Sequence, residues 1–92
     1  MRLIGRVRLA SLAKEDADTA RWVASWMVEL QDANWKRSSD ILGHFPKVIQ
    51  KNNGTFVFPV SHHKIGIHVL ITFPQSLVLI VAIRVLEVTN GH

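Results

Sequence analysis

The stretch TFVFPVSHHKIGIHVLITFPQSLVLIVAIRVLEV, residues 55–88, decides the fold class, because it contains three apolar runs separated by short polar links. The runs are rich in β-branched and aromatic residues, which favour strands, and the links SHHK and PQS suit tight connections. Three consecutive strands joined in this way predict antiparallel pairing. The nearly continuous apolar character of LVLIVAIRVLEV predicts that the last strand is central in the sheet and buried on both faces.

One more strand is predicted upstream of this stretch, at KVIQK (47–51). NNG (52–54) follows it and predicts a turn, because asparagine and glycine tolerate positive φ. Four successive strands with short connections predict an antiparallel meander. Near the amino terminus, RLI (2–4) is either a short strand or a lead-in, and Gly5 follows it.

Two helices are predicted before the strands. RVRLASLAKED (6–16) predicts the first, with Val7 and Leu9 to Leu12 on its apolar side. Asp16 or Asp18 is expected to cap the second. That helix has an apolar stripe at i, i+3, i+4 and i+7, which consists of Val23, Trp26, Met27 and Leu30. The sequence therefore predicts an α+β fold with two N-terminal helices packed on a small antiparallel sheet.

The segment between the second helix and the strands predicts one short helical turn at DILGHF (40–45). Ser38 or Ser39 is expected to cap this turn, and Pro46 to end it, because proline disfavours the helical conformation of its predecessor. In the helix before it, Trp22 and Trp26 are four residues apart. We interpret these tryptophans as core packing, with base stacking as the alternative.

The composition is that of a globular protein: 92 residues, 48% hydrophobic and 20% charged, with no cysteine and a net charge of +4. This length predicts a single domain, residues 1–92. The start of the chain lacks the features of a signal peptide, and LVLIVAI (77–83) is far shorter than the roughly 20 residues of a membrane span. We therefore expect a cytoplasmic protein that does not associate with a membrane.

Basic residues outnumber acidic ones in the middle of the chain. Between residues 36 and 64 the only acid is Asp40, and the basic residues are Lys36, Arg37, Lys47, Lys51 and Lys64. Such an excess suits a polyanionic partner, although a solvated protein surface has the same appearance.

Several motifs of this chain resemble the HigB toxin family of type II toxin–antitoxin systems, within the RelE-like superfamily of mRNA interferases. ANWK (33–36) and SSDI (38–41) resemble the A-x-W-K and P-A-D-I of that family. The same order continues with FP (45–46), NN (52–53) and FVFPV (56–60). The resemblance extends from the amino terminus to about Ile80. It implies a RelE-like fold, a ribonuclease that cuts mRNA on the ribosome, and a helix-turn-helix antitoxin of the HigA type as partner.

The chain departs from the family pattern in its last strands. Ile65-Gly66 stand where the family has Y-R, so the strand arginine is absent. Ile80-Val81 stand where the family has I-R, and Arg84 follows three residues later. The closing G-T-H-x-E-Y-D has no counterpart in VLEVTNGH (85–92), through either divergence or a changed reading frame.

RelE-like toxins cut RNA through attack of a ribose 2′-hydroxyl on the adjacent phosphate. This reaction uses a base, cationic groups on the phosphate oxygens and an acid at the leaving oxygen. The chain has no tyrosine, so the candidate catalytic residues are His62, His63, Lys64, His68 and Arg84, with the terminal His92 a weaker candidate. A solvated turn is the alternative interpretation for residues 62–64, and a histidine satisfied beside the core is the alternative for His68.

Four further basic residues are candidates for RNA binding through phosphate contacts: Lys36, Arg37, Lys47 and Lys51. No cofactor or metal is expected, because the adjacent His62 and His63 have no carboxylate close in sequence. The residues therefore support two main hypotheses, an active HigB-like ribonuclease and a toxin-fold protein that binds antitoxin, RNA or ribosome without cleaving. A basic interaction domain outside toxin biology is a third.

Overall fold

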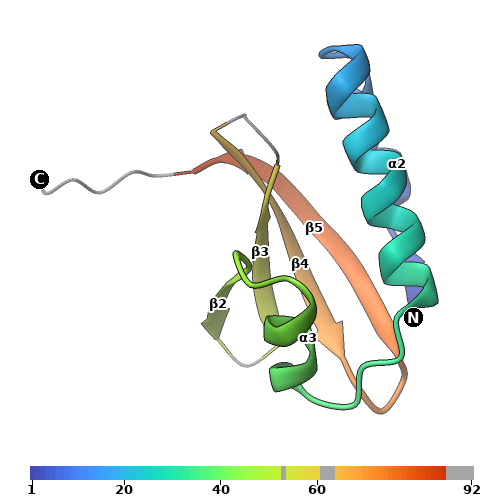
Figure 1. Cartoon of the computed structure of the whole chain (residues 1–92), viewed down its shortest axis with the longest axis vertical. Helices are drawn as coiled ribbons and strands as arrows, with labels where there is room; N and C mark the ends of the chain where they lie inside the picture. Colours follow the sequence, from blue (N-terminus) through green and yellow to red (C-terminus); the bar gives the residue numbers. More distant parts are fainter. Residues whose placement is uncertain (53, 61–63, 87–92) are drawn as a thin grey trace, which may run out of the picture.

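A mixed sheet of five strands organises the molecule. The computed structural model describes residues 1–52, 54–60 and 64–86. The strands are β1 (Arg2–Ile4), β2 (Ile49–Asn52), β3 (Thr55–Pro59), β4 (Ile65–Thr72) and β5 (Leu77–Val85), in the order β1-β5-β4-β3-β2. Figure 1 shows helix α2 (Ala17–Asp32) beside this sheet, with the short α3 (Ser38–His44) between α2 and β2 in that view.

The predicted antiparallel meander is confirmed for β2 to β5, in which each strand pairs with the next. Gly54, in the predicted turn before β3, has a φ of 83°. The RLI segment is a strand rather than a lead-in. It pairs in parallel with β5, with Arg2 opposite Leu77 and Ile4 opposite Leu79. β1 is therefore an edge strand of the sheet, next to β5.

The first helix is shorter than the sequence predicted. A 3₁₀ helix, η1 (Arg6–Leu9), leads into α1 (Ala10–Ala13), and the expectation of a helix through Asp16 is wrong. The chain must reverse there to start α2, and the amides of Lys14 and Glu15 form turn hydrogen bonds instead. Val7 is 83% exposed rather than on the apolar side. Side chains three apart share a face in a 3₁₀ helix, so the buried Leu9 is not aligned with Val7.

Helix α2 agrees with its sequence pattern. Of the two predicted caps, Asp16 is the one used: its Oδ1 accepts a hydrogen bond from the Thr19 amide at 2.7 Å. Val23, Trp26 and Leu30 are buried, and Met27 packs against them. The stripe that was read from the sequence is therefore the face that α2 places against the sheet.

Helix α3 begins differently from the prediction. Ser38 and Ser39 lie inside the helix, and the extended Arg37 precedes it. The amides of Lys36 and Arg37 donate to Asp40 Oδ2 at 2.8 and 3.3 Å, so this carboxylate fixes the start of α3 in place of a serine hydroxyl. The bond from the Lys36 amide is the largest cause of a lowered pKa of Asp40. Together with the Arg37 amide and the Arg37 and Lys36 charges, it outweighs the opposing effect of desolvation.

The core lies between the helices and one face of the sheet. Buried side chains of β4 and β5 on this face join the buried residues of α2; they are Ile67, Val69, Ile71, Val78 and Ile80. Strand β5 lies between β1 and β4, so its predicted central position is confirmed. Its predicted burial on both faces is wrong, because Leu79 and Val81 are 40% and 45% exposed. We call the face without helices the open face of the sheet.

Candidate functional site

A β-bulge in β5 determines which side chains reach the open face. Val69 pairs with Ile80, but His68 pairs with Ala82, so Val81 is an extra residue in β5. If β5 had no bulge, strict alternation along it would put Arg84 on the same face as Val78 and Ile80, in the core. Because a bulge shifts the alternation by one residue, Ile83 instead lies opposite the buried Ile67 and Arg84 lies opposite Gly66. The exposed Arg84 therefore shares the open face with His68.

Two positively charged side chains act on His68, which lies on this face. His68 and Arg84 line a shallow hollow of about 270 Å³ together with Thr55, Leu70 and Ala82. Partial burial lowers the pKa of His68 below 6.5, and the positive charges of Arg84 and Lys51 lower it further. This lowering of the pKa favours the uncharged imidazole at neutral pH, which can accept a proton, with the side chains of Arg84 and Lys51 near it.

An apolar row adjoins this cationic group. Ile4, Leu79 and Leu70 lie on three neighbouring strands in register, and their exposed fractions are 39%, 40% and 38%. Contiguous exposed apolar residues on a sheet face are typical of a surface that contacts another molecule. The open face thus combines cationic and apolar character.

The structure brings together only some of the predicted catalytic residues. His68 and Arg84 meet on the open face. Lys64 lies just before β4, exposed, and its carbonyl accepts a hydrogen bond from the Leu86 amide at 2.8 Å. It is thus two residues from Gly66, the cross-strand partner of Arg84, at the same end of the sheet. His62, His63 and His92 lie outside the described residues.

The four predicted RNA-binding residues do not form one surface. Lys51, in β2, is near enough to His68 to influence its pKa. Lys36 and Arg37 flank the start of α3, next to the buried Trp35, on the helix side of the sheet. Lys47 lines a separate groove beside α2. Thr55 was not singled out from the sequence, because only the β3–β4 register brings it opposite Leu70, beside the hollow.

No group of three or more histidine, cysteine or acidic side chains suited to a metal ion occurs within residues 1–52, 54–60 and 64–86. In the same part of the chain, no helix has both the length and the apolar character of a membrane span. A scan against models of known protein families finds no match, and a search of curated proteins finds no significant relative. The function must therefore be argued from the site itself and from the motifs of the sequence.

Proposed function

We propose that this chain is a HigB-like toxin with a RelE-like fold, an endoribonuclease that cuts mRNA. The observation that carries the proposal is the uncharged His68 on an open sheet face, near Arg84 and Lys51. Support also comes from the order of the elements, helices followed by an antiparallel meander, and from the ANWKRSSDI segment (33–41). Because mRNA is the proposed substrate, we also propose a cytoplasmic location.

In the proposed reaction, His68 removes the proton from a ribose 2′-hydroxyl. The 2′-oxygen then forms a bond to the adjacent phosphorus, and the bond from phosphorus to the 5′-oxygen of the next nucleotide breaks. Arg84 and Lys51 hold the phosphate oxygens, on which negative charge develops. Lys64 donates the proton to the leaving 5′-oxygen. The products are a 2′,3′-cyclic phosphate and a 5′-hydroxyl end, and no cofactor takes part.

The cross-strand pairing offers a replacement for the missing family arginine. Gly66 stands where the family has its strand arginine, and Arg84 is the residue directly opposite on β5. Both positions face the same side of the sheet, so a guanidinium group from β5 can serve the surface that a side chain at position 66 would serve. This exchange explains how a chain without the Y-R motif retains a phosphate-binding group.

A second candidate function is antitoxin or ribosome binding without cleavage. The exposed row of Ile4, Leu79 and Leu70 favours it, because apolar contact surface adds to protein binding and contributes little to phosphate contacts. In both readings we propose a HigA-type helix-turn-helix antitoxin as the partner.

A cleavage experiment separates the two functions. The purified protein is incubated with a short labelled RNA and with the same RNA carrying one 2′-deoxynucleotide at the cut position. We expect cleavage of the first substrate only, with a 2′,3′-cyclic phosphate detected by mass spectrometry. His68→Ala and Arg84→Gln should each lower the rate by about 100-fold or more, the usual size of a general-base or charge-stabilising contribution.

Arg8→Gln is the matched control, because it removes the same charge from an exposed arginine of η1; its rate should equal that of the wild type. If RNA stays intact both in this assay and in cells while the protein still binds a HigA-type antitoxin, the second function is correct. Expression in bacteria complements this assay, since a ribosome-dependent toxin would arrest growth and cut transcripts in cells although it fails on free RNA. If the protein neither cuts RNA in either setting nor binds the antitoxin, both functions are wrong.

A further inference from the structure

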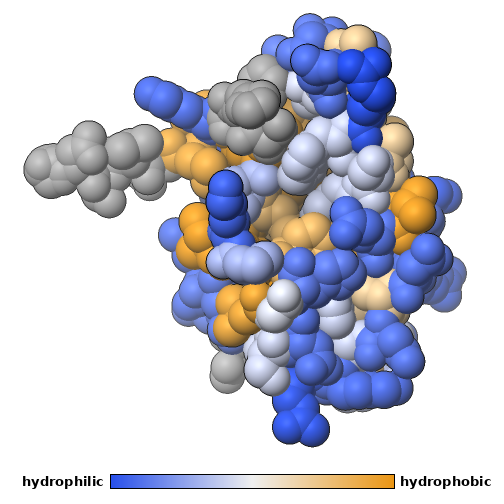
Figure 2. All heavy atoms as spheres, viewed as in Figure 1, coloured by the Kyte–Doolittle hydropathy of each residue, from blue (hydrophilic) through white to orange (hydrophobic). Residues whose placement is uncertain are grey.

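A second concave site lies on the helix side of the sheet. It is a groove of about 380 Å³ between α2 and the chain that connects α3 to β2. Figure 2 shows orange and pale residues, of high and intermediate hydropathy, in the hollow between these two parts, with hydrophilic residues around them. The groove shares no lining residue with the hollow at His68 and Arg84. It therefore needs an explanation of its own.

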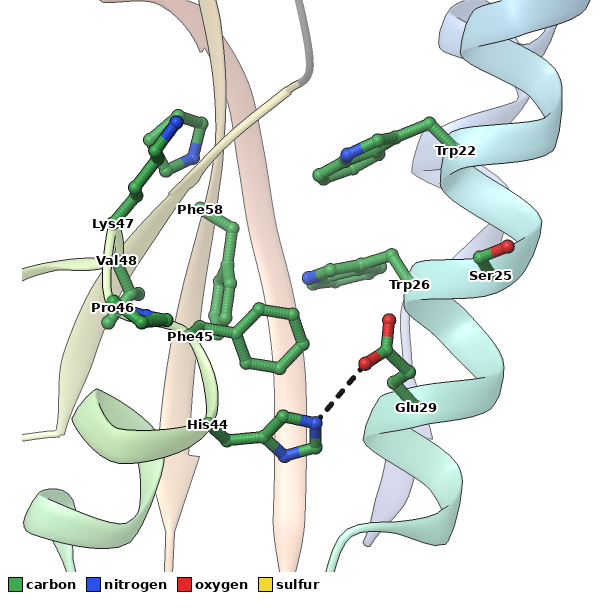
Figure 3. A pocket seen from close by; sticks show the side chains of 11 residues that line it. Trp22, Ser25, Trp26, Glu29, His44, Phe45, Pro46, Lys47, Val48 and Phe58 are labelled. Carbon is green, nitrogen blue, oxygen red and sulfur yellow. Dashed lines mark hydrogen bonds and ion pairs between the residues drawn. The ribbon is translucent and has the colours of Figure 1, made fainter.

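Aromatic rings form the walls of this groove (Figure 3). Trp22 and Trp26 of α2 are nearly parallel, at 11°, with ring centroids 6.3 Å apart. Phe58 meets Trp26 edge to face at 5.4 Å, and Phe45 meets Phe58 in the same way at 5.1 Å. Trp26 and Phe58 are fully buried, so these rings are fixed in position. Such a lining suits the flat face of an aromatic ligand.

The groove is lined by one acidic side chain, which has a hydrogen-bond partner, and by one lysine, which has no ion-pair partner among the described residues. At one end Trp35 Nε1 donates to His44 Nδ1 at 3.3 Å, so the second nitrogen of that ring carries the hydrogen and donates to Glu29 Oε1 at 3.2 Å. The Glu29 carboxylate therefore already has a hydrogen-bond partner, His44. Lys47 lies apart from this pair in Figure 3, and it has no ion-pair partner among the described residues. It is also the only lysine or arginine among the described residues that line the groove.

We propose that this groove binds a small planar aromatic monoanion, of the size of two fused rings with one carboxylate. The rings lie against the partly exposed Trp22 and Phe45, and the carboxylate interacts with Lys47. The volume falls within the range of about 300–1,000 Å³ that is usual for small-molecule sites. A single cation matches one negative charge, whereas a nucleotide phosphate would bring further charge close to Glu29 without a second cation to balance it.

The probe for the test is 2-naphthoate, titrated by calorimetry against the full chain. Its amide, 2-naphthamide, has the same shape without the charge, and adenosine monophosphate represents nucleotides. We expect saturable binding of 2-naphthoate, and weaker binding of the amide and of the nucleotide. Lys47→Gln should weaken 2-naphthoate binding by about fivefold, the upper range for one exposed ion pair, while Lys14→Gln, which removes the same charge from an exposed site beyond α1, should leave it unchanged.

The position of the ligand is read from the indole N–H signals of the three tryptophans, assigned with Trp22→Phe and Trp35→Phe. We expect the Trp22 and Trp26 signals to shift in proportion to saturation. The proposal is overturned if no saturable binding occurs up to millimolar concentration or if adenosine monophosphate binds more tightly than 2-naphthoate. It is also overturned if the amide signals of the open face, such as those of Leu70 and Leu79, shift instead.

Discussion

Gly66 shows how strongly a single residue is constrained on the open face. A Cβ added there would lie 2.6 Å from Val57 Cγ1 and 2.7 Å from Leu86 Cδ2. Val57 is buried and cannot move aside. We expect Gly66→Ala to lower the free energy of unfolding by about 1–3 kcal/mol, the usual cost of overpacking, in urea denaturation.

Gly43 provides the matched control for this substitution. It lies within α3, and an added Cβ would meet nothing within 4 Å. Gly43→Ala should therefore raise the free energy of unfolding by about 0.5–1 kcal/mol, because alanine loses less conformational freedom in a helix. Equal effects of the two substitutions would show that crowding at Gly66 is not the cause.

The protonation of His68 gives a second prediction at this scale. Burial is the larger cause of its lowered pKa, and Arg84 is the next. Arg84→Gln should therefore raise the His68 pKa only part of the way to 6.5, as measured from the ring proton shifts in an NMR titration. A pKa that stays the same in this variant would contradict the proximity of the two side chains.

The same pKa has a consequence for stability. Because the folded-state pKa lies below the unfolded value of 6.5, the contribution of neutral His68 is present above that pH and is lost as the pH falls through the folded pKa. His68→Gln should remove this part of the pH dependence of unfolding. The acid limb of the proposed cleavage reaction should likewise lie below pH 6.5 and move upward in Arg84→Gln.

At the scale of the elements, we expect the stability of α2 to depend on the capping contact in its first turn. The Asp16 carboxylate accepts from the Thr19 amide, and Asp16→Ala should cost about 1 kcal/mol of unfolding free energy, measured by thermal or urea denaturation. Asp18→Ala is the comparison, since Asp18 forms an ion pair with the exposed Arg21. It should cost clearly less, because exposed ion pairs contribute little. A greater loss for Asp18→Ala would show that the cap is not the main stabilising contact.

How well each element could be predicted depends on whether its sequence signal is local. The stripe of α2 and its aspartate cap are local patterns. The stripe was predicted, and Asp16 was one of the two predicted caps. The start of α3 was not, because Asp40 caps it from inside the helix whereas the two serines matched the usual pattern. The faces of β5 were also misjudged, since a run of apolar residues does not reveal a bulge that depends on pairing with β4.

At the scale of the whole molecule, the basic residues are divided between two sides of the sheet. If RNA binds the open face, Lys51→Gln should reduce the slope of log affinity against log salt concentration by about 0.7, the value for one phosphate contact to a single strand. Lys36→Gln should leave the slope unchanged, since Lys36 flanks α3 on the helix side. The slopes are measured by fluorescence anisotropy over a series of salt concentrations. The reverse result would show that RNA binds the helix side of the sheet rather than the open face.

The candidate site itself could be predicted only in part. His68 and Arg84 were chosen from the sequence by residue type, but their proximity follows from the β4–β5 register. Lys51 was assigned to a general basic surface, and the structure associates it with His68. The groove beside α2 was not predicted, because it needs Phe45 and Phe58 to approach the two tryptophans, and that approach is a property of the tertiary fold.

The pairing of β1 with β5 has a consequence for the timing of folding. Residues 2–4 are synthesised well before their partners, residues 77–79. Contacts between such distant segments form late, because a long loop must close before they yield any stabilisation. The nascent chain on the ribosome therefore carries an unpaired β1 until β5 has been made, and the proposed nuclease surface, which needs Arg84 of β5, cannot assemble before then.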